Sequence, residues 1–263
     1  MSYLKLHDAN IYYERNGCGK TLVLLNGIMM STTSWTYHVE KLAKIFDVIT
    51  LDFRDQGNSS KMKDGYDLSV HSNDLSNLLE HLKIRKASIL GVSYGAHVAE
   101  IFALEHPDKI EKLILSNAVD KTDNYLRELG RAWEIAAQTY DATLFFKVSL
   151  PTIYSRTFYN SHLDWVESRI KTFSKVMTRE WFDAFIRLSK SEAYFDVSKD
   201  ISKIVAPTLL IAAEEDMITP KSIMERMHKK IKDSLIVSIP QAGHAAFLEK
   251  ADLFCDIIKG FLN

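Results

Sequence analysis

Short apolar segments alternate with helical patterns over most of this 263-residue sequence, and this order restricts the possible folds more than any other feature. The apolar segments are continuous, which is typical of strands that are buried on both faces. Strands and helices in this alternation predict an α/β protein with a mostly parallel, doubly wound sheet. The expected strands are 21–25, 48–53, 87–90, 113–115, 207–211 and 234–239, after an antiparallel hairpin over 3–6 and 11–14 at the sheet edge. The expected helices are 35–45, 68–82, 96–105, 221–231 and 247–261.

The alternation stops after Asn117 and resumes near residue 200. Residues 119–199 read as consecutive helices that are rich in Trp, Tyr and Phe. Because ligands bind at the carboxyl edge of open parallel sheets, we interpret this segment as a helical cap inserted over that edge. The predicted division is a core of residues 1–118 and 200–263 and a cap of residues 119–199. Most of the cap aromatics are expected to pack the cap helices, and some to line an apolar pocket.

The sequence Gly91-Val92-Ser93-Tyr94-Gly95 directly follows an expected strand and directly precedes an expected helix. A serine in so tight a strand-to-helix turn has a strained backbone, and side chains two residues before or after it would collide with their neighbours. Glycines at both positions remove these collisions. The helix N-terminus also provides unpaired backbone N–H groups. This pattern predicts that Ser93 is a nucleophile.

A serine hydroxyl needs a base, and the base needs a third group that orients it. His244 follows the last expected strand and Asp216 follows the strand before it, so both are expected at the same sheet edge as Ser93. The predicted catalytic residues are therefore Ser93, Asp216 and His244. Glu214 and Glu215 remain alternatives to Asp216. The other histidines, including His97 on the helix after Ser93, are expected to pack or to face solvent.

With the segment Leu24-Leu25-Asn26-Gly27-Ile28-Met29-Met30, the whole chain resembles single-domain, cap-bearing α/β-hydrolases of the esterase, enol-lactonase and haloperoxidase-like group. The resemblance implies an eight-stranded sheet and an oxyanion site formed by the backbone N–H groups of Ile28 and Tyr94. Asn26 stands where the family usually has histidine. We interpret Asn26 as a structural hydrogen-bonding residue, with a substrate contact left open. The candidate pocket residues are Asn26, Met29 and Met30.

A second departure from the family pattern lies in the segment Asp52–Ser59, where Asp55 replaces a glycine. This segment is interpreted as a structural loop beneath the active site.

The predicted function is hydrolysis of a carboxylic ester, lactone or thioester of a small apolar substrate through an acyl-enzyme on Ser93. Carbon–carbon bond hydrolysis, lyase activity and perhydrolysis use the same three residues and stay open, as does a ligand-binding receptor on the same fold. No phosphate-binding glycine loop, His-Glu-x-x-His or Cys-x-x-Cys pattern is present, so no cofactor or metal is expected.

The bulk properties restrict the partners and the location. The formal net charge is −1 with scattered Lys and Arg, which excludes nucleic-acid binding through bulk charge. There is no apolar segment near the length of about 20 residues that spans a bilayer. We therefore expect a small-molecule substrate, no membrane insertion, a monomer or homodimer, and a cytoplasmic location.

Overall fold

The computed structural model describes residues 2–263 and contains an eight-stranded sheet in the order β1-β2-β4-β3-β5-β6-β7-β8. β1 and β2 pair in antiparallel fashion, β2 is antiparallel to β4, and all other neighbouring strands are parallel. The predicted doubly wound, mostly parallel sheet of eight strands is confirmed. The strands are β1 (Ser2–Lys5), β2 (Asn10–Gly17), β3 (Thr21–Leu25), β4 (Asp47–Leu51), β5 (Ala87–Val92), β6 (Ile110–Ser116), β7 (Thr208–Ala213) and β8 (Ser234–Ile239).

Helices cover both faces of the sheet. The core helices are α1 (Thr36–Leu42), α2 (Ser69–His81), α3 (Tyr94–Glu105), α9 (Lys221–Lys230), α10 (Ala246–Glu249) and α11 (Ala251–Leu262), with short 3₁₀ helices at Thr32–Trp35, Pro107–Lys109 and Ile201–Lys203. α1 and α11 pack against each other, and α2 packs against α3. Side chains of α2, α3 and α9 belong to one apolar cluster, whereas those of α1 and α11 belong to another.

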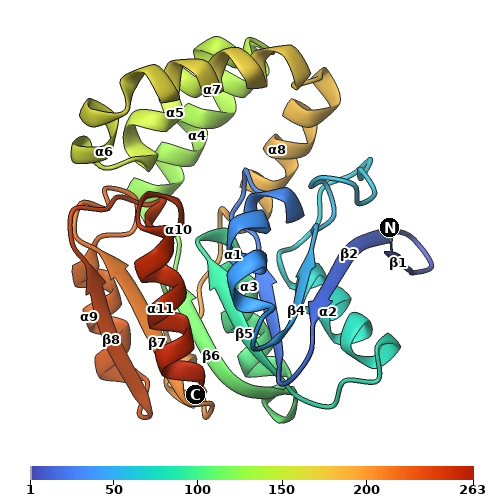
Figure 1. Cartoon of the computed structure of the whole chain (residues 1–263). Coiled ribbons are helices and arrows are strands. Elements are labelled where there is room, and N and C mark those ends of the chain that lie inside the picture. Colours follow the sequence, from blue (N-terminus) through green and yellow to red (C-terminus); the bar gives the residue numbers. More distant parts are fainter. Residues whose placement is uncertain (1) are drawn as a thin grey trace.

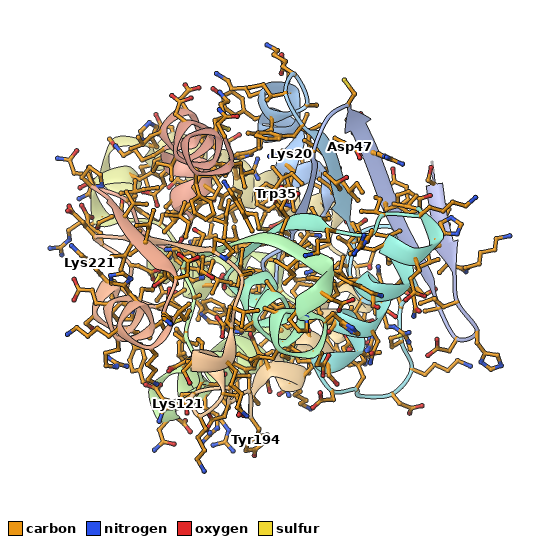
Figure 2. The ribbon with its side chains drawn as sticks, turned by 90° about the horizontal axis from the view of Figure 1, so that it is seen from below. Lys20, Trp35, Asp47, Lys121, Tyr194 and Lys221 are labelled. Carbon is orange, nitrogen blue, oxygen red and sulfur yellow. The ribbon has the colours of Figure 1, made fainter. Side chains whose placement is uncertain are left out.

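The central strands contribute alternate side chains to these two clusters. In β3, Val23 and Leu25 lie in the first cluster, whereas Leu22 and Leu24 lie in the second. All four side chains are fully buried. Burial on both faces explains why the strand sequences are continuous in apolar residues rather than alternating. Figure 2 shows the side chains between the layers, with Trp35 inside the molecule and Lys221 and Tyr194 at its periphery.

The predicted helix over residues 247–261 is wrong in one respect, because the structure divides it into α10 and α11. The break is at Lys250, whose φ of −131° and ψ of 47° are not helical. The last residue of α10, Glu249, hydrogen-bonds Ser155, which is remote in the sequence. The direction of α10 is therefore set by a tertiary contact that local periodicity does not reveal. The predicted helix over 35–45 likewise begins as a 3₁₀ turn and ends at Leu42.

A helical insertion lies between β6 and β7. It consists of α4 (Asn124–Gln138), α5 (Ala142–Ile153), α6 (Arg156–Ser161), α7 (Leu163–Val176) and α8 (Arg179–Glu192). Figure 1 shows these helices gathered above one end of the sheet. Among residues 2–263, no helix combines the length and the apolar character that crossing a membrane requires.

Asp55 connects the loop after β4 to this insertion. Its side chain is fully buried, and its carboxylate accepts two hydrogen bonds from Arg187 of α8, at 3.0 Å from Nε and 2.7 Å from Nη2. The backbone of Asp55 has a φ of 70°, a region that favours glycine. Asp55 thus keeps a strained conformation at a family glycine position and forms a bidentate ion pair across 132 residues of sequence.

Replacement of Arg187 by methionine is expected to lower the free energy of unfolding by about 3 kcal/mol, because it leaves a buried carboxylate without its cation. Asp55→Gly is expected to have a smaller effect, since it removes the buried charge and the strain together. Urea unfolding of both variants and of the double variant tests this account. The double variant should be more stable than Arg187→Met alone. If the decreases in the free energy of unfolding of the two single variants simply add in the double variant, the lost ion pair does not explain the effect of Arg187→Met.

Candidate active site

Ser93 stands between β5 and α3 with a φ of 54° and a ψ of −120°. Its backbone N–H donates to the Ser116 carbonyl at 3.0 Å, which holds the turn against the end of β6. A Cβ on Gly91 would lie 2.2 Å from the Gly95 carbonyl oxygen, and a Cβ on Gly95 would lie 2.5 Å from the Leu25 carbonyl oxygen. This confirms the prediction that a side chain at either glycine position would collide with neighbouring backbone.

The structure brings Ser93, His244 and Asp216 into one chain of hydrogen bonds. His244 Nε2 lies 2.8 Å from Ser93 Oγ, and His244 Nδ1 lies 2.9 Å from Asp216 Oδ2. These residues are 151 and 28 positions apart in the sequence. An imidazole held on one side by a carboxylate can accept the serine proton on the other side.

Two further side chains orient Asp216, and the sequence analysis did not identify their role. Asn117 Nδ2 and Thr219 Oγ1 each donate to Asp216 Oδ2 at 2.6 Å, while the N–H groups of Ile218 and Thr219 donate to Oδ1. Burial alone raises the pKa of Asp216, but the charge and hydrogen bond of His244 and the Thr219 hydrogen bonds outweigh it and hold the pKa below its ordinary value. The sequence offered one indication of this role for Asn117, namely its position directly after β6 at the same sheet edge as Asp216.

The loop that carries His244 is fixed against the insertion. A Cβ on Gly243 would lie 2.4 Å from the backbone nitrogen of Ser155, so the two chain segments are in close contact. The Glu249 carboxylate accepts hydrogen bonds from Ser155 N at 2.8 Å and from Ser155 Oγ at 2.6 Å, and from Gly243 N at 3.3 Å. The position of the imidazole therefore depends on the α5–α6 connection as well as on the core.

The N–H groups of Ile28 and Tyr94 are free to bind an oxyanion. Within residues 2–263, neither group donates a hydrogen bond to another protein atom. The Tyr94 side chain is fully buried, with its hydroxyl 2.9 Å from His71 Nε2 and 2.7 Å from Ser191 Oγ. Next to Ile28, the Gly27 N–H donates to Met30 Sδ at 3.1 Å.

Asn26 does not line the cavity that contains Ser93. Its side chain is fully buried, and Nδ2 donates to the Leu51 carbonyl at 2.8 Å and to Gln56 Oε1 at 3.0 Å. Its Oδ1 accepts from Trp35 Nε1 at 2.7 Å. Gln56 in turn donates to the Gly27 carbonyl at 2.9 Å. Asn26 thus occupies a structural position that supports the loop of Ile28, rather than the pocket position considered from the sequence.

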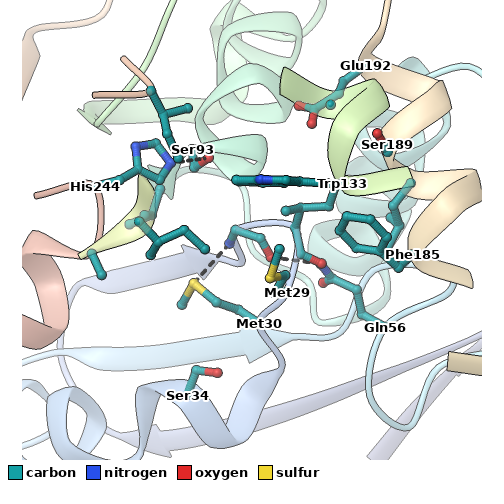
Figure 3. Close-up of a pocket in the computed structure, with 18 of the residues that line it drawn as sticks. Met29, Met30, Ser34, Gln56, Ser93, Trp133, Phe185, Ser189, Glu192 and His244 are labelled. Atoms are coloured by element: carbon teal, nitrogen blue, oxygen red, sulfur yellow. Dashed lines mark hydrogen bonds between the residues drawn. The ribbon is translucent and has the colours of Figure 1, made fainter. Parts of the chain in front are cut away.

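A cavity of about 1100 Å³ opens between the sheet edge and the insertion. Its wall contains Ser93, His244, Ile28, Met29 and Met30, so the structure brings the two candidate methionines to the pocket. Figure 3 shows Ser93 and His244 near Met29 and Met30, with the Trp133 ring extending toward Ser93 in this view. The insertion contributes mainly apolar side chains, namely Leu126, Leu129, Trp133, Phe146, Leu150, Ile153, Tyr154, Phe173, Met177, Trp181, Phe185 and Leu188.

The alternative acid and base residues have other contacts. Glu215 accepts a hydrogen bond from Thr157 Oγ1 of the insertion at 2.7 Å. His97 stacks on Phe195 with ring centroids 4.5 Å apart, and its Nδ1 lies 3.0 Å from Glu192 Oε2. Over residues 2–263, no group of three or more His, Cys, Asp or Glu side chains is arranged to hold a metal ion.

Comparisons with known proteins agree with this architecture. Residues 20–251 match the family described as alpha/beta hydrolase fold. The chain is 24% identical to a putative carbamate hydrolase RutD of Azorhizobium caulinodans over 99% of this chain and 98% of that protein, and 28% identical to a proline iminopeptidase of Lactobacillus acidophilus over 92% and 89%. Among solved structures, the alpha/beta hydrolase enzyme MGS-M2 from a Medee basin deep-sea metagenome library is 38% identical, with a TM-score of 0.95 over 99% of this chain and 97% of that one. The chain therefore belongs to the alpha/beta hydrolase fold family.

Proposed function

We propose that this protein is a serine hydrolase that cleaves a carboxylic ester, lactone or thioester of a small apolar substrate. The observation that carries the proposal is the continuous hydrogen-bonded chain from Ser93 Oγ through His244 to Asp216. In this proposal His244 Nε2 takes the Ser93 proton as Oγ attacks the substrate carbonyl, and an acyl-enzyme forms on Ser93.

His244 then returns the proton to the leaving oxygen or sulfur. In the second half of the reaction, His244 activates a water molecule that attacks the acyl-enzyme and regenerates Ser93. Asp216 stays ionised, fixes the imidazole with Nδ1 protonated and stabilises the imidazolium. The lowered pKa of Asp216 supports this role, because the carboxylate remains charged at neutral pH.

The N–H groups of Ile28 and Tyr94 are the proposed oxyanion donors. Both lack a partner among the described residues, and Tyr94 begins α3, where the helix N-terminus favours negative charge. The anchored side chains of Tyr94 and Gln56 hold the two peptide segments in place. The tetrahedral intermediate is therefore stabilised by backbone groups that need no rearrangement.

The helical insertion supports the apolar part of the proposal. We propose that residues 119–199 act as a cap over a core of residues 1–118 and 200–263, since α4, α5, α7 and α8 all contribute side chains to the cavity that contains Ser93. Small-molecule sites are mostly apolar with a few polar groups, as this one is. The monomeric or homodimeric state and the cytoplasmic location remain predictions from the sequence.

Turnover of p-nitrophenyl esters with increasing acyl length tests the proposed function. The butyrate ester is expected to exceed the acetate ester by about tenfold in kcat/KM, because each buried methylene contributes about 0.8 kcal/mol. Activity should be unaffected by a chelator and lower by at least about 10⁴-fold in a Ser93→Ala control. Equal rates for acetyl and longer acyl chains would contradict an apolar pocket, and loss of activity with the chelator would contradict the serine mechanism.

A further inference from the structure

Arg169 lies on α7 and lines the cavity that contains Ser93. Its guanidinium carbon is 4.9 Å from the ring centroid of Trp165 and 4.8 Å from that of Phe173. The Nε atom is buried and has no hydrogen-bond partner. Within residues 2–263, Arg169 has no ion pair and no hydrogen bond to another side chain or to the backbone, and the two aromatic rings contact a half-buried guanidinium whose Nε lacks an acceptor.

The other arginines of the cavity wall are already satisfied. Arg127 donates to the Ala193 and Thr122 carbonyls and to Asn124 Oδ1. Arg131 pairs with Glu128 at 3.0 Å and is largely exposed. Arg169 therefore differs from both in having no acceptor.

The carboxylates near the cavity are also occupied. Asp55 pairs with Arg187, Glu134 accepts from Ser189 Oγ at 2.7 Å, and Glu192 contacts His97. Glu249, outside the wall, accepts from Ser155 and Gly243. Among the described residues, none of the three acids of the cavity wall forms an ion pair with Arg169.

A second unpaired donor lines the same cavity. Trp133 Nε1 of α4 is buried and has no acceptor in the described part of the chain, and an indole N–H can only donate. A buried donor without a partner is destabilising, so a wholly apolar ligand would leave Trp133 Nε1 unsatisfied. A polar ligand can supply an acceptor for Trp133 Nε1, and a carboxylate suits Arg169 because the planar guanidinium binds two carboxylate oxygens at once.

We infer that the substrate carries a carboxylate in addition to its scissile ester, lactone or thioester, and that Arg169 binds this carboxylate. The inference rests on the proposed function, since it places an anionic end group in the cavity where Ser93 acts. The apolar wall then holds the body of the substrate between Ser93 and Arg169. Arg169 determines specificity and takes no part in the bond-breaking step.

The test compares mono-p-nitrophenyl adipate with its methyl ester, which has the same acyl chain without the charge. Wild-type protein is expected to show a kcat/KM about tenfold or more higher for the anionic ester. Arg169→Met should lower kcat/KM for the anionic ester by about 10- to 100-fold, the range for a charge-assisted hydrogen bond, and leave the methyl ester within about twofold. Arg226→Met is the matched control, because it removes an exposed arginine of α9 that does not line the cavity; it should leave both esters unchanged.

A parallel pair, 4-acetoxybutanoate and its methyl ester, places the carboxylate on the alcohol side. An Arg169-dependent preference for the anion in either pair supports the inference and assigns the side. It is overturned if neither pair shows such a preference, or if Arg169→Met slows charged and neutral esters equally. In that case, continued turnover of the neutral esters leaves the proposed function standing.

A binding measurement separates the two proposals if no ester is hydrolysed. Calorimetry with monomethyl adipate is then performed on wild-type protein and on Arg169→Met. Saturable binding to the wild type that is lost in Arg169→Met supports the anion site although the proposed function has failed. Equal binding to both proteins, or binding to neither, overturns the anion site.

Discussion

Ser93→Ala is expected to lower kcat for an ester substrate by about 10⁴- to 10⁶-fold, the range seen when a serine nucleophile is removed from a hydrolase. His244 would then have no hydroxyl to deprotonate at the 2.8 Å position that Ser93 Oγ occupies. The N–H groups of Ile28 and Tyr94 and the cavity would remain, so weak catalysis above the uncatalysed rate should persist. Steady-state hydrolysis of p-nitrophenyl butyrate by wild type and variant provides the measurement.

Ser93→Gly is the matched companion of Ser93→Ala, because both remove the hydroxyl and only glycine relieves the backbone. Ser93 has a φ of 54°, which strains any residue with a Cβ. We expect Ser93→Gly to be as inactive as Ser93→Ala, but to have a free energy of unfolding that is higher by about 1 kcal/mol. This difference is the backbone strain that glycine relieves, minus the greater conformational entropy that glycine gives the unfolded chain. Residual activity near the wild-type level in either variant would show that Ser93 is not the nucleophile.

Asp216→Asn is expected to lower kcat by about 10⁴-fold with little change in KM. Asp216 Oδ2 accepts from His244 Nδ1, Thr219 Oγ1 and Asn117 Nδ2, and Oδ1 accepts two backbone N–H groups. An amide places an NH₂ group among these donors and favours the imidazole tautomer with its proton on Nε2, which cannot accept the serine proton. Steady-state kinetics with the butyrate ester separate kcat from KM.

Glu215→Gln is the control for Asp216→Asn, because Glu215 is the adjacent carboxylate and was a candidate for the same role. Glu215 accepts from Thr157 in the structure and has no hydrogen bond to His244. Its replacement should leave kcat within about threefold of wild type, as expected for a group outside the reacting chain. If Glu215→Gln were the more damaging change, the assignment of the orienting acid would be wrong.

The parts of the fold that could be predicted from the sequence are those in which local pattern and tertiary environment agree. β3 has the predicted bounds because a strand buried on both faces is continuous in apolar residues. β8 also has the predicted bounds, although this edge strand is mostly half-buried and Leu235 is exposed. The order of Ser93, Asp216 and His244 at strand ends was predictable for a related reason. Parallel strands bring their carboxyl ends to one edge, so the position of a residue after its strand also fixes its position in space.

The contacts that were missed join residues remote in the sequence. Glu249 and Ser155 are 94 positions apart, and neither residue type in its local pattern indicates the other. The same contact accounts for the break between α10 and α11, which the periodicity of residues 247–261 concealed. Asp55 was noted as a departure from a glycine, but its ion pair with Arg187 depends on how α8 lies over the core.

In the candidate site, too, the sequence predicted what local position determines and missed what depends on tertiary contacts. The sequence identified Ser93, His244 and Asp216 by position, whereas the supporting Asn117 became evident only through its contact with Asp216. Arg169 is one of three basic residues on α7, and the sequence analysis did not single it out. Its significance depends on which other charges in the cavity already have partners, and that is a property of the assembled side chains.

Reaction with a fluorophosphonate tests the central claim most directly, because only an activated serine is phosphonylated rapidly at neutral pH. Intact-mass spectrometry of the full chain should show one adduct per protein molecule, and peptide mapping should place it on Ser93. Ser93→Ala should remain unlabelled under the same conditions. The absence of an adduct on the wild-type protein, or an adduct on another residue, would contradict the assignment of Ser93 as the nucleophile.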